Sequence, residues 1–463
     1  MKRTVYKWLV ASSVLVGMIG GAAATGKTRP KYGGTLRVAS GAALTSLDPA
    51  DGSQVDSFSR NSITALLFDT LVKLDASGRA QPWLATSWDG TADGKRWTLH
   101  LRRGVVFHDG SGMTADAVAS SLRMANASWN VLAGPDDVTI QSEKPVPNLP
   151  AMLALPGNAI VKRGSSPGVS GSGPFRVADW QPGKKLTLAA FEDCWRGRPY
   201  LDAIEIELGR PAGDRLAALE AGRSDLIDVP VEISRRVALG GNSASTSLSA
   251  ELIVMVFAKD AQTSDELTLR NALALSLDRA SLHNVVMQGA GDAQGGILPD
   301  WMTGYGALFA SQADLVRART LRRQAQAASV WSLKYDGGDA LLRLLAERIA
   351  LNAKDADLVV KPVTEGTADA RLVRIVLPTT DAWVDLAAVA NVAGLPPIPN
   401  LPDAGGGPEQ LYAAEVRMLA GRRVVPLLHL PAEYAASRKL RGFSAGACGN
   451  WQVSDAWLEP ATP

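Results

Sequence analysis

The sequence predicts an α/β protein with two lobes. A chain of 463 residues is longer than a single hydrophobic core usually serves, so two or more lobes are expected. In the second half, helical patterns alternate with apolar strand patterns, as at residues 339–352 and 358–363, which is typical of α/β folds. Residues 252–257 and 424–430 are continuous apolar runs, and such runs indicate strands that are buried on both faces.

The first elements after the N-terminal segment follow from local patterns. A strand is predicted at Thr35–Ala39, and apolar residues with helical spacing predict a helix within residues 59–74. Alternating residues on both sides of Asp93-Gly94 predict a hairpin over residues 88–102. Thr114 is the expected N-cap of the helix that follows.

Later elements are predicted in the same way. Residues 175–180 and 186–191 are expected to form paired strands joined by a Gln-Pro-Gly turn. Residues 240–250 are rich in Gly and Ser and are expected to form a surface loop. The capping box Thr263-x-x-Glu266 predicts the start of a helix.

The first 24 residues have the pattern of a secretory signal peptide. Basic side chains at positions 2, 3 and 7 precede a mostly apolar segment at residues 8–19, and residues 22–24 provide an A-x-A cleavage site. The apolar segment is too short to span a bilayer comfortably, and an uncleaved anchor is the alternative interpretation. The pattern therefore predicts a periplasmic product.

Composition excludes several classes of protein. Removal of the predicted signal peptide takes away three of the 48 Lys and Arg residues and none of the 46 Asp and Glu residues, which leaves a nearly neutral chain. No basic block remains, so nucleic acid is not an expected partner. No later apolar run approaches 18 residues, so no stable membrane insertion is expected.

Cysteine usage leaves one question open. Cys194 and Cys448 are the only cysteines in the chain. In an oxidising compartment this pair is compatible with a single disulfide, and two free buried thiols are the equal alternative.

No assembled catalytic or metal-binding set occurs in the sequence. His100, His108, His283 and His429 lack a His partner three or four residues away, and H-E-x-x-H and C-x-x-C are both absent. Residues 168–173 (GVSGSG) do not match the nucleophile-elbow pattern. We therefore expect no enzymatic activity, no metal site and no cofactor.

Residues 104–122 (GVVFHDGSGMTADAVASSL) are the most informative stretch, because an FHDG turn there links the hairpin to the helix after Thr114. Further motifs follow a fixed order: residues 32–36 (YGGTL), 46–49 (SLDP), 171–175 (GSGPF), 180–183 (WQPG), 195–201 (WRGRPYL), 218–230 (ALEAGRSDLIDVP) and 270–279 (RNALALSLDR). In order and spacing this series resembles the family 5 extracellular solute-binding proteins, the peptide- and nickel-type receptors of ABC importers.

The resemblance implies a two-lobed periplasmic-binding-protein fold, class II-like and of the cluster C type. The chain is shorter than typical relatives, which implies a reduced accessory subdomain. The implied organisation is a signal peptide at 1–24, lobe I with the accessory subdomain at 25–250 completed by 432–463, lobe II at 251–431, and crossing strands near 252–258 and 424–430.

The resemblance also implies a function. The protein is expected to capture a small solute, an oligopeptide or a related compound, and to deliver it by hinge closure to the permease of an ABC importer. A monomer is expected. The alternatives are a diverged binding protein with a sensory or chaperone-like role and, from a different class, a secreted hydrolase.

The resemblance points to two segments that face the ligand. The first is the loop after the first strand, with Ser40, Gly41 and Ala42, whose small side chains leave space. The second is the end of the first crossing strand, Phe257 and Ala258. Many relatives carry Asn at the position that matches Ala258.

Three further residues complete the predicted ligand site. Trp301 is expected either to stack on the ligand or to pack between lobes. Asp381 and Trp383 are the counterparts of an Asp- and Trp-containing stretch whose Asp pairs with the α-ammonium of a peptide in relatives. A helix N-cap is the alternative role for Asp381.

Overall fold

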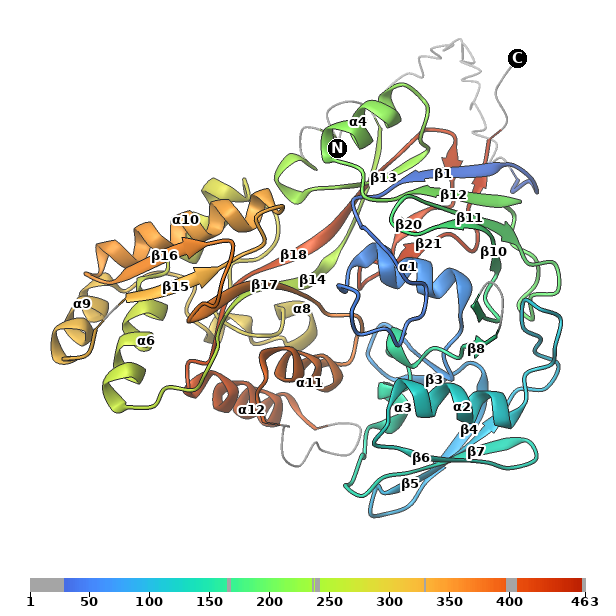
Figure 1. Ribbon diagram of the computed structural model, residues 1–463, viewed down its shortest axis with the longest axis horizontal. Helices are drawn as coiled ribbons and strands as arrows, with labels where there is room; N and C mark the ends of the chain where they lie inside the picture. Colours follow the sequence, from blue (N-terminus) through green and yellow to red (C-terminus); the bar gives the residue numbers. More distant parts are fainter. Residues whose placement is uncertain are drawn as a thin grey trace, which may run out of the picture.

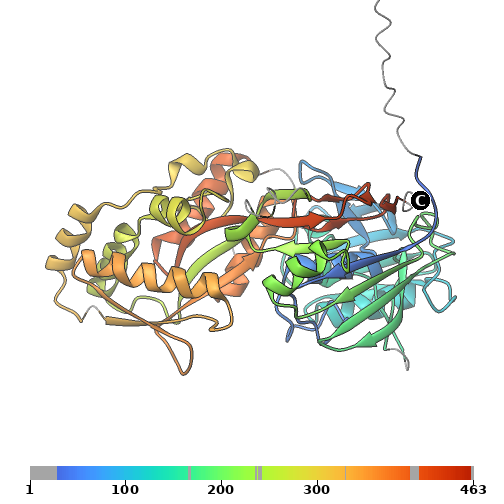
Figure 2. The same ribbon diagram turned by 90° about the horizontal axis from the view of Figure 1, so that it is seen from above.

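The computed structural model describes residues 29–164, 168–234, 237, 242–328, 330–396 and 406–459, so the predicted signal peptide lies outside the described residues. The chain forms two lobes that lie side by side (Figures 1 and 2). We call lobe I the half that contains α1, α2 and β1, and lobe II the half that contains α6, α10 and α11. The sequence-based lobe boundaries stay a prediction.

A ten-stranded mixed sheet runs through both lobes. Its two long central strands pair antiparallel and pass from one lobe to the other (Figure 1). Continuous burial along their apolar runs explains why hydrophobic side chains fill both faces there. In sheet order the strands are β10 (Phe175–Gln181), β11 (Lys185–Ala190), β12 (Ala203–Glu207), β1 (Thr35–Ala39), β13 (Leu226–Val229), β18 (Val424–Ala436), β14 (Ser243–Phe257), β17 (Ala370–Val376), β15 (Val330–Lys334) and β16 (Val359–Val363).

Helices cover both faces of the sheet in lobe II. One face packs against α6 and α10, whose buried residues include Leu273 and Leu345, and the other against α11 and α12 with Leu386 and Leu411. The helices of lobe II are α6 (Ser264–Ser276), α7 (Arg279–Ser281), η3 (Leu282–Val286), α8 (Asp300–Thr303), η4 (Gly306–Leu308), α9 (Leu315–Gln324), α10 (Ala340–Asp355), α11 (Ala382–Ala393) and α12 (Pro408–Ala420).

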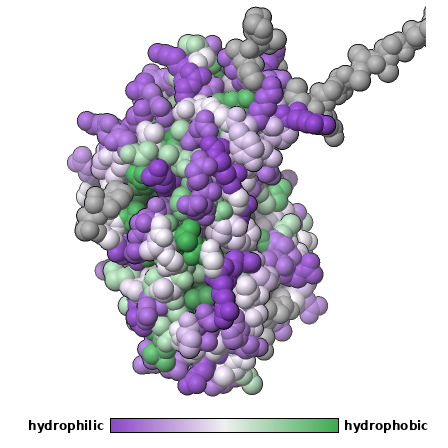
Figure 3. Space-filling view, turned by 90° about the vertical axis from the view of Figure 1, so that its right-hand side faces the viewer, coloured by the Kyte–Doolittle hydropathy of each residue, from purple (hydrophilic) through white to green (hydrophobic). Residues whose placement is uncertain are grey.

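Lobe I combines its part of the large sheet with a smaller accessory unit, in which α2 packs on a four-stranded sheet of order β4-β5-β7-β6. The strands of lobe I outside the large sheet are β2 (Val72–Leu74), β3 (Ala80–Pro82), β4 (Ala85–Gly90), β5 (Arg96–Leu101), β6 (Asn130–Ala133), β7 (Asp137–Gln141), β8 (Lys162–Arg163), β9 (Val169–Ser170), β19 (Leu440–Arg441), β20 (Ser444–Ala445), β21 (Trp451–Gln452) and β22 (Trp457–Leu458). The helices are α1 (Phe58–Leu67), α2 (Ala115–Ala125), α3 (Leu149–Met152), η1 (Pro156–Asn158), α4 (Ala212–Glu220) and η2 (Val231–Ile233). Hydrophilic side chains are interspersed with small apolar areas on the outer face of lobe I (Figure 3).

Local start signals predicted several helices correctly. The Thr114 hydroxyl accepts a hydrogen bond from the Ala117 backbone N–H and caps α2. The Thr263 hydroxyl caps α6 in the same way, while the Glu266 carboxylate accepts from the backbone N–H of Gln262. The predicted hairpin over residues 88–102 is formed by β4 and β5.

The structure corrects two of the sequence-based expectations and decides the open question about the cysteines. The predicted surface loop over residues 240–250 is wrong for residues 243–250, because β14 begins at Ser243 and pairs with β18 from its first residue, which overrides the low strand propensity of Ser. Residues 240 and 241 lie outside the described residues. The helix predicted within residues 59–74 ends at Leu67, since Leu71 packs in the core of the accessory unit while Leu67 packs in the core of the large sheet. Both cysteines are free thiols, so the disulfide alternative is not realised.

Candidate functional site

A cavity of about 430 Å³ lies between the two lobes. Most of its wall comes from lobe I, namely α1, β2 with the residues around it, η1 and the segment 447–452, while residues 378–380, between β17 and α11, close it from lobe II. In Figure 1 this turn is the part of lobe II that reaches toward α1. The lining residues are Asn61, Thr64, Ala65, Phe68, Asp69, Thr70, Lys73, Leu74, Asp75, Ala76, Ala154, Pro156, Ala159, Pro378, Thr379, Thr380, Ala447, Cys448, Asn450 and Gln452.

Hydrogen bonds join the lobes at the edge of this cavity. The Thr380 hydroxyl donates to the backbone carbonyl of Asp75 over 2.7 Å, and the Cys448 thiol donates to the Thr379 carbonyl over 2.9 Å. Beside them, the Asn148 side-chain amide donates to the Asp381 carboxylate over 3.0 Å. The structure is therefore a closed arrangement, in which the start of α11 touches lobe I.

Asp69 is a buried residue of the cavity wall and is surrounded by donors. Its carboxylate accepts from the indole N–H groups of Trp83 and Trp195 over 2.8 and 3.0 Å, and from the Ser172 hydroxyl over 2.9 Å. The Arg196 guanidinium lies 3.4 Å from the same carboxylate. All these partners belong to the protein, so Asp69 orients the wall of the cavity and has little capacity left for a ligand.

The other acids near the cavity are also engaged or neutral. The Asp75 carboxylate accepts from Ser77, Arg79 and Gln81, and the Ser77 hydroxyl contributes most to the lowered pKa of Asp75. Asp385 is fully buried, and burial raises its pKa well above the usual range, which favours the neutral form. The one described hydrogen bond of its carboxyl group comes from the Thr379 hydroxyl.

Several polar side chains of the lining have no partner. Among the described residues, the side-chain amides of Asn61, Asn450 and Gln452 and the hydroxyl of Thr64 make no hydrogen bond within the protein. The three amides offer both donors and acceptors, and the hydroxyl offers one of each. The cavity is thus equipped to bind the hydroxyl, carbonyl or carboxylate groups of a solute.

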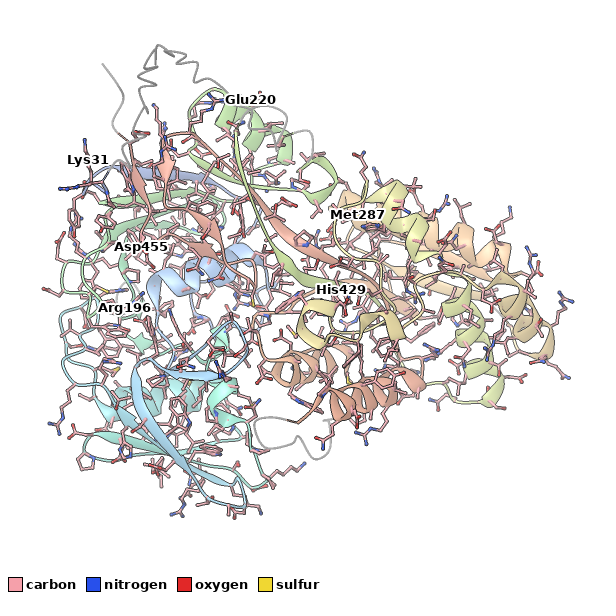
Figure 4. All side chains as sticks on the ribbon, turned by 180° about the vertical axis from the view of Figure 1, so that it is seen from behind. Lys31, Arg196, Glu220, Met287, His429 and Asp455 are labelled. Atoms are coloured by element: carbon pink, nitrogen blue, oxygen red, sulfur yellow. The ribbon has the colours of Figure 1, made fainter. Side chains whose placement is uncertain are left out.

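Lys73 adds a positive charge to this lining. Its ammonium lies 3.5 Å from the centre of the Trp83 ring and has no ion-pair partner among the described residues. The side chain keeps contact with solvent, yet burial by the surrounding walls lowers the pKa of Lys73 to about 8. Repulsion by Arg196 lowers this pKa further, and the more weakly acting Asp69 opposes it. Arg196 lies in lobe I beside the Trp83 and Trp195 rings (Figure 4).

Comparison with known proteins shows which family this architecture belongs to. Residues 79–374 match the family described as bacterial extracellular solute-binding proteins, family 5 Middle. The chain belongs to the family 5 solute-binding proteins. Its fold is that of their two-lobed periplasmic binding proteins.

Individual relatives are distant from this family 5 protein. The nickel-binding protein NikA of Staphylococcus aureus is 25% identical over 240 residues, which cover 48% of each chain. The glutathione-binding protein GsiB of Pectobacterium atrosepticum is 28% identical over 325 residues, covering 64% of this chain and 60% of the relative. The match thus spans about half to three fifths of these relatives. A solved structure, DppA of Helicobacter pylori with the peptide STSA, superposes with a TM-score of 0.78 at 19% identity and covers 93% of this chain and 99% of DppA.

The predicted loop after β1 is occupied by contacts within lobe I. The Ser40 hydroxyl donates to the Ser59 hydroxyl over 2.9 Å, and the Gly41 backbone N–H donates to the Asp228 carboxylate over 3.1 Å. The Ala42 backbone N–H bonds the Ser40 hydroxyl. These three residues lie outside the lining of the interlobe cavity, and their ligand role stays a prediction.

Phe257 and Ala258 line a different cavity. It measures about 300 Å³ and lies at the end of β14 that is remote from lobe I. Trp301 donates its indole N–H to the Ser249 carbonyl over 2.8 Å, which agrees with its alternative packing role. The structure therefore does not bring these three residues into the lining of the interlobe cavity.

Asp381 and Trp383 lie at the start of α11, next to the cavity. Asp381 is the N-cap, and its carboxylate accepts from the backbone N–H groups of Trp383 and Val384 over 2.9 and 3.0 Å. The helix-cap alternative is thus confirmed, and the other carboxylate oxygen binds Asn148. Trp383 is buried, and its indole N–H donates to the Gly406 carbonyl. A ligand role for either residue stays a prediction.

Sequence reasoning missed the polar lining of the cavity. Asn61 lies in α1 and Lys73 in β2, whereas Asn450 and Gln452 lie near the C-terminus. One local signal existed: Lys73 lies between the apolar residues Val72 and Leu74 in a short strand, so the alternation of the strand turns it to the opposite face from these neighbours.

Two of the histidines have structural contacts. His429 lies in β18 (Figure 4) and its Nε2 is 2.9 Å from the Ile297 carbonyl, while His108 Nε2 is 3.0 Å from the Gly173 carbonyl. Burial lowers the pKa of both side chains. In the part of the chain that is described, no group of three His, Cys, Asp or Glu side chains is placed to hold a metal ion. Every described helix is also too short or too polar to cross a membrane.

Proposed function

We propose that this protein is a periplasmic receptor that captures a small solute in the interlobe cavity and delivers it to an ABC importer. The observation that carries the proposal is the cavity itself, which lies between the lobes and is lined by polar side chains without partners in the protein. Membership of the family 5 solute-binding proteins supports the same reading.

The geometry suits reversible capture. A volume of about 430 Å³ lies in the lower part of the range that small-molecule sites occupy, roughly 300–1,000 Å³. Residues 378–380 reach the cavity from lobe II, so separation of the lobes would open it and closure would bury the solute. The closed form then presents a surface that a permease distinguishes from the open form.

The proposal concerns binding without chemical change of the solute. The family to which this chain belongs consists of substrate-binding transport proteins. The ligands of these relatives, nickel, glutathione and a peptide, differ from one another, so they do not identify the solute of this chain. A sensory or chaperone-like role would use the same cavity without a permease.

Thermal unfolding in the presence of solutes tests the proposal. A solute at about 100 times its dissociation constant adds roughly 2.7 kcal/mol to the free energy of unfolding, which a thermal-shift assay detects. The same solute should be recovered unaltered by mass spectrometry. The double variant Asn450→Ala, Gln452→Ala should lose most of the shift, while Gln326→Ala, an exposed amide on lobe II, should keep it.

Two results would contradict the proposal. The first is a solute whose thermal shift in the double variant Asn450→Ala, Gln452→Ala equals its shift in the unchanged protein. The second is conversion of the bound solute into a product by the purified protein.

A further inference from the structure

The acidic side chains in the lining of the interlobe cavity have partners within the protein, whereas the lysine does not. Two acids of the lining, Asp69 and Asp75, have their oxygens engaged by Trp, Ser, Gln and Arg donors of the protein. Lys73, in contrast, has neither a hydrogen-bond acceptor nor an ion-pair partner among the described residues. The one unneutralised charge in the described lining is therefore positive.

The contact that holds the Lys73 ammonium in place leaves its charge available to a ligand. Trp83 attracts the Lys73 ammonium through the negative face of its ring, which holds the group in place without supplying a formal negative charge. Asp69 orients the ring through the indole N–H of Trp83. The ammonium has three N–H donors, and the ring face does not use all of them.

The field at Lys73 is also positive on balance. The Arg196 guanidinium lies 4.9 Å from the centre of the same Trp83 ring, and its effect on the pKa of Lys73 exceeds the opposing effect of Asp69. An anion beside Lys73 would relieve this repulsion, whereas a second cation would increase it.

Among the described residues around the cavity, no carboxylate is free to pair with an ammonium group of a solute. Asp381 uses its carboxylate on two backbone N–H groups and on Asn148. Asp385 is buried, and its carboxyl group accepts a hydrogen bond from the Thr379 hydroxyl. In the described part of the site, the groups left for a ligand are thus one ammonium, three amides and one hydroxyl.

We propose that the solute is a small carboxylate that also carries hydroxyl groups, and that Lys73 receives its carboxylate. Asn61, Thr64, Asn450 and Gln452 then bind the hydroxyl groups, as amides and hydroxyls both donate and accept. The assignment rests on the proposed function and adds the chemical class of the solute. It makes Lys73 the residue that selects anions over neutral and cationic solutes of the same size.

Matched probes of equal size test the assignment. Isothermal titration calorimetry would compare D-gluconate and D-galacturonate with the neutral D-glucose, the cationic D-glucosamine and the zwitterionic dipeptide Ala-Ala. We expect binding of at least one of the two acids and weaker or no binding of the other three. Loss of one charge-assisted hydrogen bond weakens binding about 10- to 100-fold.

Variants of Lys73 separate recognition from folding. Lys73→Met should weaken binding of the acid by that factor and leave the unfolding midpoint of the free protein nearly unchanged, because Met retains the apolar part of the side chain. Lys73→Arg should restore most of the affinity. Lys95→Met, which removes an exposed lysine away from the cavity, is the matched control and should change neither.

The outcomes distinguish the inference from the proposed function. Tight binding of D-glucosamine or Ala-Ala without binding of the acids would overturn the inference and leave the receptor function standing. Binding of an acid that Lys73→Met does not weaken would overturn the role of Lys73. Absence of any stabilising solute from a wider screen of acids, neutral sugars, amines and peptides would overturn both.

Discussion

Replacement of Asp381 tests whether this carboxylate serves the fold or the ligand. Its oxygens accept from two backbone N–H groups at the start of α11 and from the Asn148 amide of lobe I. In Asp381→Ala the cap is lost, which costs roughly 0.5–2 kcal/mol and typically about 1 kcal/mol. The Asn148 amide, which is largely buried, also loses its partner, at about 1–3 kcal/mol. We expect a total loss of about 2–4 kcal/mol of unfolding free energy.

A second variant separates the two contributions. Asp381→Ser retains a good capping side chain but is too short to reach Asn148, so it should recover about 1 kcal/mol of the loss. Urea unfolding followed by tryptophan fluorescence reports the change, since Trp383 lies in the first turn of α11. Asp314→Ala is the matched control, because Asp314 caps α9 and makes no described contact with lobe I. It should cost about 1 kcal/mol.

The reasoning about Asp381 is refuted by either of two results. A loss below about 0.5 kcal/mol in Asp381→Ala would show that the cap and the Asn148 contact contribute little. Full stability of Asp381→Ser together with complete loss of solute binding would show that the carboxylate acts on the ligand.

Four predictions concern other groups of the site. Affinity for an anionic solute should be constant near pH 6 and should fall as the pH rises through about 8, because the anion binds the charged form of Lys73, whose pKa is about 8 in the free protein and rises in the complex. Calorimetry between pH 6 and 10 measures this decrease, and Lys73→Arg should remove it. Asp69→Ala should lower the unfolding free energy by about 2–4 kcal/mol, since it leaves a partly buried guanidinium and two partly buried indole N–H groups without their acceptor. An unchanged urea midpoint would contradict the role of Asp69 in orienting these groups. Burial raises the pKa of the Cys194 and Cys448 thiols, so both should react slowly with a disulfide reagent in the native protein. In denaturant without reductant both thiols should react with the reagent, whereas a disulfide would leave no reactive thiol. Asn148→Ala should weaken every solute by a similar factor of about 2 to 10, because its contact with Asp381 joins the two lobes; an effect confined to one charge class in the calorimetric panel would contradict this.

Local patterns in the sequence were sufficient for much of the fold. Helix starts at Thr114 and Thr263 depend on side chains within three residues of the cap, so they were predicted correctly. The strand predicted at Thr35–Ala39 begins and ends at those residues in the structure. The long apolar runs marked the central strands, but their polar extensions were missed, because residues 243–249 form a strand only through pairing with β18.

The candidate site was much harder to predict. Asn61 and Gln452 face the same cavity from opposite ends of the chain, and no spacing rule connects them. Asp381 was found because a carboxylate before a helix is a local signal, yet the same signal described its capping role and not a ligand role. Free polar groups are recognised only after all hydrogen bonds of the fold have been assigned, which requires the three-dimensional structure.

The arrangement separates closure from recognition. The start of α11 supplies groups that contact lobe I, and protein partners engage those groups. These contacts therefore stabilise the closed form whatever the charge of the solute. The free groups lie on lobe I, where the Asp69–Trp83 pair fixes Lys73. A solute can then bind to lobe I first and become enclosed when lobe II closes. Because the two sets share no residue, substitutions in one set should add to substitutions in the other, apart from the coupling through closure itself.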